Sequence, residues 1–232
     1  TPAYLSKVLM GFQTKLLPKF QKSLNYYEGK QAIMQKQATD VGKPCNKIVV
    51  NYCDNIVKNY LGYLTGIPIS YENEKFEEVL DILKWNDVVN EDNELLKDAL
   101  IFGRSFEINY IDDEGQQRFK LFDPRECIPI YDNTLNQDLL YVVRFYREDL
   151  IDEQVENYIV EVYTPGEIIK YKSGPGFTSF NEISRTPHYY GQCPITVFSL
   201  NDEEVSIFEK IIKFKIYFYS FWQMDFYFDY WL

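Results

Sequence analysis

The front of the chain carries apolar side chains at helical spacing. Residues 3–27 predict one helix, and Pro18 either kinks it or separates two helices, because proline lacks the N–H that an interior turn needs. Asn46 is a candidate N-cap for a next helix over residues 48–64, which ends near Gly66. The wide apolar stripe of that helix predicts that one of its sides is buried.

Two more helices are predicted next, and after them the spacing of apolar residues changes from helical to alternating. The spacing predicts helices over Glu74–Trp85 and Asp92–Phe102, after an extended stretch at Ile67–Tyr71. From Arg104 onward apolar and polar residues alternate, so Ser105–Ile111 and Arg118–Phe122 predict a β-hairpin. Further strands are predicted at Cys127–Tyr131, Leu139–Tyr146, Asn157–Tyr163, Glu167–Lys172 and Ile195–Leu200, with a loop at Gly174–Gly176. Helices followed by antiparallel strands indicate an α+β fold.

The last part of the chain differs from the rest. About half of the residues from Phe208 to Leu232 are aromatic, so a helix made of them would be apolar nearly all round. Exposed in a monomer, such a helix would favour aggregation. We therefore divide the chain into an α+β body, residues 1–205, and an aromatic helical tail, residues 206–232.

Charge limits the partners that the chain can hold. The 35 acidic residues outnumber the 24 basic ones, which gives a net charge of −11 and disfavours tight, static binding of DNA. Basic side chains recur along the first segment, where a solvated helix face is favoured over a nucleic-acid contact; they are Lys15, Lys19, Lys22, Lys30 and Lys36. We expect no membrane span, since no uncharged apolar run reaches about 18 residues, and residues 1–17 do not form a signal peptide.

The residues that could perform catalysis do not form a recognisable set. His188, the single histidine, lies in a turn-like stretch, where a solvated or tyrosine-packed ring is favoured over a general base. Asp112, Asp113 and Glu114 could bind a divalent cation, but a solvated hairpin turn is favoured. The cysteines have no metal-ligand spacing and predict reduced, mostly buried thiols; they are Cys45, Cys53, Cys127 and Cys193. We therefore predict no catalytic, cofactor-binding or metal-binding residues and no cofactor.

An ordered set of segments resembles the portal proteins of tailed double-stranded DNA bacteriophages. The likeness covers about residues 25 to 210. The segments are Tyr26–Ile33 (YYEGKQAI), Asn46–Val57 (NKIVVNYCDNIV), Gly62–Tyr71 (GYLTGIPISY), Ala99–Glu107 (ALIFGRSFE), Leu121–Asp132 (LFDPRECIPIYD), Val143–Tyr146 (VRFY) and Pro194–Glu204 (PITVFSLNDEE).

The resemblance implies a structural role. Portal subunits form a ring, usually of twelve copies, at one vertex of the phage head, so the expected location is the virion, with host cytoplasm as the site of assembly. The expected partners are other copies of the chain, terminase, scaffold or capsid proteins, head-completion proteins and double-stranded DNA that passes without tight binding. The resemblance implies no enzymatic activity, because terminase hydrolyses the ATP. The chain would form the antiparallel β-rich wing and the start of a divergent stem helix.

The chain departs from the family in length and in its last residues. Portal proteins are roughly twice as long, and residues 213–232 do not match a polar, amphipathic stem helix. We therefore expect a truncated product, through a frameshift or an early stop in a degraded prophage gene. Two other functions stay open: another non-enzymatic virion or interaction protein with the same fold, and a carboxylate metal-dependent nuclease that uses Asp112, Asp113 and Glu114.

Overall fold

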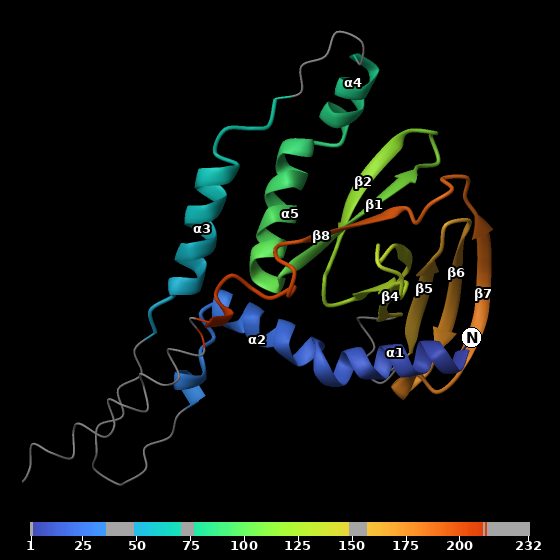
Figure 1. Ribbon diagram of the computed structural model, residues 1–232, viewed down its shortest axis with the longest axis horizontal. Helices are drawn as coiled ribbons and strands as arrows, with labels where there is room; N and C mark the ends of the chain where they lie inside the picture. Colours follow the sequence, from blue (N-terminus) through green and yellow to red (C-terminus); the bar gives the residue numbers. More distant parts are fainter. Residues whose placement is uncertain (1, 36–48, 71–76, 149–156, 211, 213–232) are drawn as a thin grey trace, which may run out of the picture.

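The computed structural model describes residues 2–35, 49–70, 77–148, 157–210 and 212 (Figure 1). Helices come first and antiparallel strands follow, so the predicted α+β class is confirmed. The helices are α1 (Pro2–Lys15), α2 (Leu17–Tyr27), α3 (Tyr52–Leu64), α4 (Glu77–Trp85) and α5 (Val88–Phe102), with two 3-10 turns, η1 (Ala32–Gln35) and η2 (Pro175–Phe177). The strands are β1 (Arg104–Ile111), β2 (Gln117–Phe122), β3 (Cys127–Tyr131), β4 (Leu139–Arg147), β5 (Tyr158–Tyr163), β6 (Glu167–Ser173), β7 (Phe180–Pro187) and β8 (Ile195–Ser199).

The strands form two antiparallel sheets. The three-stranded sheet has the order β2-β1-β8, and the five-stranded sheet has the order β3-β4-β5-β6-β7. The predicted hairpin is confirmed: β1 and β2 pair from Phe106 opposite Phe122 to Ile111 opposite Gln117. Strand β8 returns to the other side of β1, with Arg104 opposite Ser199. Residues about a hundred positions apart therefore meet at the junction between the helices and the sheets.

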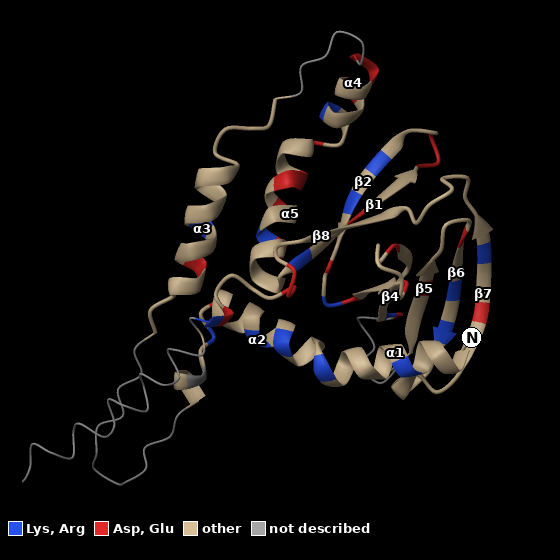
Figure 2. Cartoon of the chain, in the orientation of Figure 1, with Lys and Arg blue, Asp and Glu red and all other residues tan. Residues whose placement is uncertain are grey.

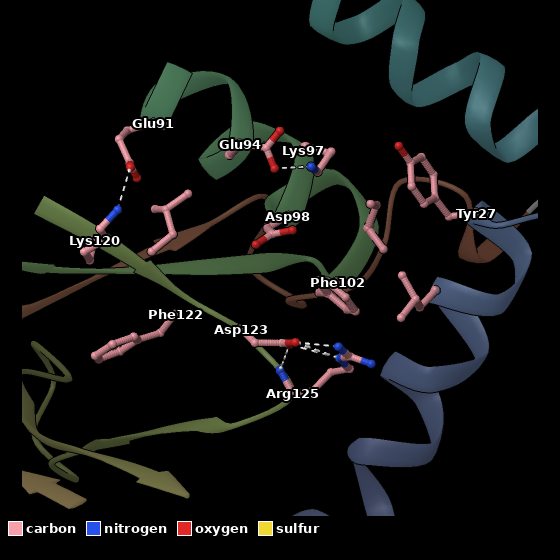
Figure 3. Close-up of a pocket in the computed structure, with 13 residues that line it drawn as sticks. Tyr27, Glu91, Glu94, Lys97, Asp98, Phe102, Lys120, Phe122, Asp123 and Arg125 are labelled. Atoms are coloured by element: carbon pink, nitrogen blue, oxygen red, sulfur yellow. Dashed lines mark hydrogen bonds and ion pairs between the residues drawn. The ribbon is translucent and has the colours of Figure 1, made fainter. Parts of the chain in front are cut away.

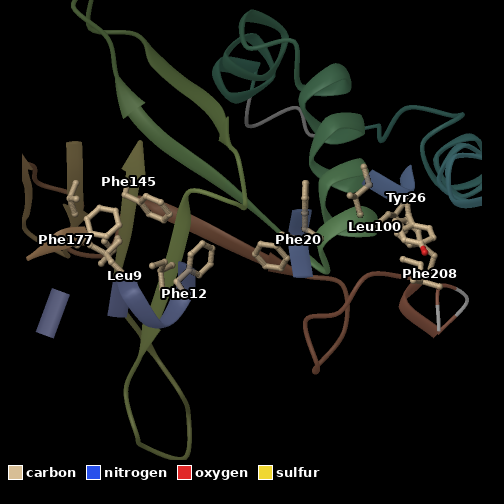
Figure 4. Close-up of a cluster of buried hydrophobic side chains, with 14 of the residues drawn as sticks. Leu9, Phe12, Phe20, Tyr26, Leu100, Phe145, Phe177 and Phe208 are labelled. Carbon is tan, nitrogen blue, oxygen red and sulfur yellow. The ribbon is translucent and has the colours of Figure 1, made fainter. Parts of the chain in front are cut away.

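Pro18 separates two helices rather than kinking one. It stands in the first turn of α2, where its missing N–H costs nothing. Helix α1 runs along the five-stranded sheet, and α2 continues toward α5 (Figure 1). The ring of Phe12 on α1 lies edge-on to Phe145 on β4, with centroids 5.7 Å apart, and also meets Phe20 on α2 at 6.0 Å. The first helix therefore covers the sheet and supplies much of its core (Figure 4).

A buried ion pair fixes the junction between α5 and β1. The side chain of Arg104 is 5% exposed, and its guanidinium donates to Glu204 at 2.9 Å and to the Cys127 carbonyl at 3.3 Å. Gly103 ends α5 with φ +87°, and a Cβ there would lie 2.4 Å from the backbone of Glu204. Only glycine allows this close approach, so the segment after β8 is held directly against the end of α5.

A second buried charge lies in the five-stranded sheet. Glu161 on β5 accepts from Lys170 at 2.8 Å, from the Tyr163 hydroxyl at 2.8 Å and from Arg144 at 3.3 Å. Burial opposes ionisation of Glu161, but the hydrogen bonds from Lys170 and Tyr163 outweigh it and hold the pKa of this carboxyl below its ordinary value. The charge is therefore paired inside the sheet.

The structure corrects several predicted boundaries. Asn51 caps α3 by accepting from the Asp54 N–H at 3.3 Å, and Val49 and Val50 precede the helix, so the predicted start at residue 48 was wrong. Asn46, the predicted cap, lies outside the described residues. Helix α5 begins at Val88, before the predicted Asp92, and strand β7 was not predicted. Within the described part of Ile67–Tyr71, residues 67–70 join neither sheet.

The residues after β8 belong partly to the body. Phe208 and Ile212 are buried in the main core, and the Ile207 N–H donates to the Leu100 carbonyl at 3.1 Å (Figure 4). Residues 213–232 lie outside the described residues, so the division after residue 205 stays a prediction.

Candidate functional site

The carboxylate of Asp112 forms its hydrogen bonds within the β1–β2 hairpin. Asp112 accepts from the Arg118 guanidinium at 2.7 Å and from the backbone N–H groups of Gln116 and Glu114 at 2.8 and 3.0 Å. The hydrogen bond from Arg118 and those from the backbone lower the pKa of Asp112. In the part of the chain that the structure describes, no three His, Cys, Asp or Glu side chains gather to hold a metal ion. The geometry therefore favours a turn over a cation site.

His188 lies against the end of β5. Its Nε2 is 2.7 Å from the Thr164 carbonyl oxygen, so this nitrogen carries the proton and donates it. Its ring lies 5.5 Å from that of Tyr190, as the tyrosine-packed alternative predicted. Nδ1, the nitrogen that could accept a proton, is buried without a hydrogen-bond partner among the described residues. This arrangement supports a structural ring rather than a general base.

Three cysteines are described, and Cys127 and Cys193 are free thiols. Cys53 and Cys127 are buried and Cys193 is half-buried. Burial raises the pKa of the Cys127 thiol and of the Cys193 thiol, which disfavours the reactive thiolate. The prediction of reduced thiols is confirmed for Cys127 and Cys193, and Cys53 is buried as predicted; Cys45 lies outside the described residues.

The basic face of the first segment is exposed along α1 and α2. Figure 2 shows basic residues along both helices at the outer edge of the molecule. We call this set the lysine row; it consists of Lys7, Lys15, Lys19 and Lys22. No ion pair joins any of the four to another described residue, whereas Lys30 pairs with Glu28 at 2.5 Å. Lys36 lies outside the described residues. The lysine row is therefore an uncompensated positive surface on an acidic chain.

Helix α3 exposes half of its apolar residues. Only Cys53 and Val57 are buried on this helix, so its predicted burial on one side holds for a narrow strip. Tyr63 is 87% exposed and Ile67 is 86% exposed. We call the exposed set the α3 stripe; it consists of Tyr60, Tyr63, Leu64, Ile67 and Ile69. Tyr60, Tyr63 and Leu64 lie three and four residues apart on one face of α3, and Ile67 and Ile69 follow in the non-helical segment after the helix. A run of exposed apolar side chains of this kind is typical of an interaction site.

Helix α3, which carries Tyr60, Tyr63 and Leu64 of the α3 stripe, is anchored at both ends. The Asn51 side-chain amide donates to the Tyr27 carbonyl at 2.8 Å, which fixes the start of α3 to the end of α2. Near the other end, the Thr65 hydroxyl donates to the side-chain oxygen of Asn93 on α5. Figure 1 shows α3 beside α5 on the side away from the five-stranded sheet. The body therefore presents the α3 stripe outward in a defined position.

The fold and this outward apolar helix fit a structural protein that assembles with other chains. The chain belongs to the phage portal protein family of the SPP1 Gp6-like type, whose family model matches residues 11–214. The likeness found in the sequence is thus confirmed. The portal protein of Bacillus phage SPP1 is 24% identical over 201 residues, which cover 80% of this chain and 39% of that protein. The portal protein of Clostridium phage phiCD119 is 26% identical over 215 residues, 82% of this chain and 47% of that protein.

The chain spans less than half the length of these two relatives. None of the described helices has the length and apolar character that a bilayer crossing needs. Two functional features were missed in the sequence: the exposure of the α3 stripe, and the half-buried carboxyl of Asp98. The signal for Asp98 was its position between Leu95 and Phe102 on the apolar face of the predicted helix.

Proposed function

We propose that this chain is a structural subunit of a phage portal, a ring of identical copies at one vertex of the capsid through which double-stranded DNA passes during packaging and ejection. Membership of the portal family supports the structural role. The α3 stripe supports assembly, because an anchored apolar surface is stabilised when another chain covers it. The proposed partners are further copies, terminase, scaffold or capsid proteins and head-completion proteins.

A ring requires a heterologous contact, in which two different surfaces of neighbouring copies meet. The α3 stripe and the lysine row lie on different helices and differ in chemistry, so the chain has unlike surfaces to offer. We propose no enzymatic activity, since Asp112 is hydrogen-bonded to Arg118 and His188 to the Thr164 carbonyl. The net charge of −11 suits a passage that DNA crosses without being held.

The observation that carries this proposal, beyond the family, is the exposed α3 stripe, and assembly tests it. Native mass spectrometry and negative-stain electron microscopy of the chain should show oligomers, with arcs or rings around a central hole. The double variant Tyr63→Ser, Ile67→Ser should lose these oligomers. The matched control is Leu135→Ser, in the β3–β4 loop, where the side chain is fully exposed outside the stripe.

Three outcomes are informative. Oligomers that disappear in the stripe variant and persist in the Leu135 control support the proposal. A chain that stays a single particle at every concentration overturns it, as does a stripe variant that assembles like the wild type. Filter binding adds an independent check on the passage: submicromolar affinity for random duplex DNA at physiological salt would contradict a channel that does not grip DNA.

A further inference from the structure

A cleft of about 500 Å³ lies where α2, α5 and β2 meet (Figure 3). Its apolar lining comes from Leu24 and Tyr27 on α2, Ile101 and Phe102 on α5, and Phe122 on β2. Four carboxylates and three basic groups lie around this lining. The cleft can therefore hold an aliphatic chain that ends in a polar group.

The charges around the cleft leave one carboxylate without a partner. Three acids are paired within the cleft itself; the pairs are Glu94 with Lys97, Glu91 with Lys120 at 3.9 Å, and Asp123 with Arg125 at 2.5 Å (Figure 3). Asp98 on α5 forms no hydrogen bond or ion pair with any other described residue. Burial raises the pKa of its carboxyl to about 6. An unpaired, half-buried carboxylate lowers the free energy of unfolding, and pairing with a cation of another molecule would offset this cost.

The same chain carries cations that lack a partner. All four side chains of the lysine row are exposed, and none forms an ion pair with another described residue. Lys15 is the last residue of α1, and Lys19 and Lys22 follow three residues apart on α2, so the three lysines lie close together along these two helices. A lysine has a four-carbon stem and an ammonium head, which match an apolar cleft with one carboxylate inside.

We propose that the Asp98 cleft of one copy receives a lysine of the lysine row, from Lys15 to Lys22, of a neighbouring copy. The inference rests on the proposed assembly and deepens it by naming the two unlike surfaces of a heterologous contact. The lysine stem lies on Leu24, Ile101 and Phe122, and its ammonium pairs with Asp98. This contact orients neighbouring copies in one direction, which a closed ring requires.

Charge reversal tests this inference in the full chain. Lys19→Asp with Lys22→Asp changes only exposed side chains and should reduce association at least tenfold, and Asp98→Lys should do the same. Each reversed chain alone should associate poorly, but a mixture of the two should assemble, because every contact in it again joins opposite charges. A single chain with all three changes should also regain association. Asp113→Lys and Glu114→Lys, both exposed on the β1–β2 turn, are the matched controls and should assemble like the wild type.

A synthetic peptide of residues 13–24 gives a second readout that does not depend on oligomers. It should bind the wild-type chain, and binding should be lost in Asp98→Asn, which keeps the shape of the side chain, and in a peptide with its three lysines changed to aspartate. Failure of the wild-type peptide to bind overturns this inference. If the wild type assembles but the reversed chains assemble equally well, the inference is wrong and the proposed function stands. If the wild type neither assembles nor binds the peptide, both are wrong.

Discussion

The five-stranded sheet and α1 bury their apolar residues against each other, whereas the region around α3 and α4 leaves many of its apolar residues exposed. In the sheet, Phe145, Val142 and Val160 are buried, and α1 closes the core from one side (Figure 4). In α4 no residue is buried, and α3 buries only Cys53 and Val57. Both regions contain many apolar residues, so composition does not explain the difference. The sheet completes its core within one chain, whereas the α3–α4 region leaves apolar surface for another chain.

This contrast separates folding from assembly. Changes in the sheet should lower the free energy of unfolding, and changes on the α3 stripe should leave it nearly unchanged while weakening association. The Asp98 cleft lies between the two regions and combines both properties, because its unpaired carboxylate costs folding stability and serves binding.

Phe145→Ala should cost about 3–5 kcal/mol of unfolding free energy, because it removes a buried ring that meets Phe12 at 5.7 Å and Phe177 at 5.6 Å. Urea denaturation followed by circular dichroism measures this loss. The matched change on the other region, Tyr63→Ala, should stay within about 0.5 kcal/mol of the wild type. Equal losses in the two variants would contradict the division.

Asp98→Asn should raise the unfolding free energy by up to about 3 kcal/mol at pH 7.5. Burial raises the pKa of Asp98 to about 6 from its ordinary 3.8, with Asp123 and Glu94 raising it further and Lys97 and Arg125 opposing. The folded chain thus holds the proton more tightly than the unfolded chain, so stability falls as pH rises from about 4 to about 6. Asparagine does not titrate at this position.

The advantage of Asp98→Asn should therefore be full above about pH 6 and vanish below about pH 4. Urea denaturation at a series of pH values measures it, with Glu114→Asn on the exposed hairpin turn as the control. A gain that does not depend on pH would show that the carboxyl is not the cause. Greater stability together with weaker association would mark Asp98 as a residue kept for binding.

Glu204→Ala should cost about 2 kcal/mol, because the buried Arg104 guanidinium loses its only carboxylate partner among the described residues. This prediction tests how firmly the segment after β8 joins the helices to the sheets. Thermal unfolding measures the change, and the exposed neighbour Glu203→Ala is the control. If both variants unfold alike, the ion pair does not hold the junction.

Asn51→Ala should cost about 1 kcal/mol, since α3 loses its N-cap and the hydrogen bond to the Tyr27 carbonyl. Hydrogen exchange should show the loss in α3 and leave the five-stranded sheet unchanged, because the anchor is local. Asn55→Ala, on the exposed side of the same helix, provides the control. Faster exchange throughout the sheet would show that the two regions unfold together.

Much of the fold followed from local patterns. The hairpin and all five of the further strands that were predicted match the structure to within one residue at each end, because apolar and polar residues alternate clearly there. Strand β3 was predicted with its observed bounds, Cys127–Tyr131. Strand β7 was missed because Phe180–Pro187 is polar and almost entirely exposed, so only its backbone pairing with β6 makes it a strand.

The functional surfaces could not be predicted in the same way. The periodicity of α3 identified an apolar stripe, but a pattern cannot tell whether the same chain or another covers it. Asp98 was one polar residue on an apolar helix face, and its lack of a partner depends on α2 and β2 meeting α5 in space. The start of α3 was placed too early because Val49 and Val50 extend its apolar pattern, whereas Asn51 provides the cap.

In the proposed assembly, a second copy of the chain covers the α3 stripe. A photo-reactive amino acid at position 63 tests this most directly, with the same group at position 135 as the control. After irradiation of the assembled chain, we expect covalent links between two copies from position 63 and almost none from position 135. Equal yields from the two positions, or no link between copies from position 63, would contradict it.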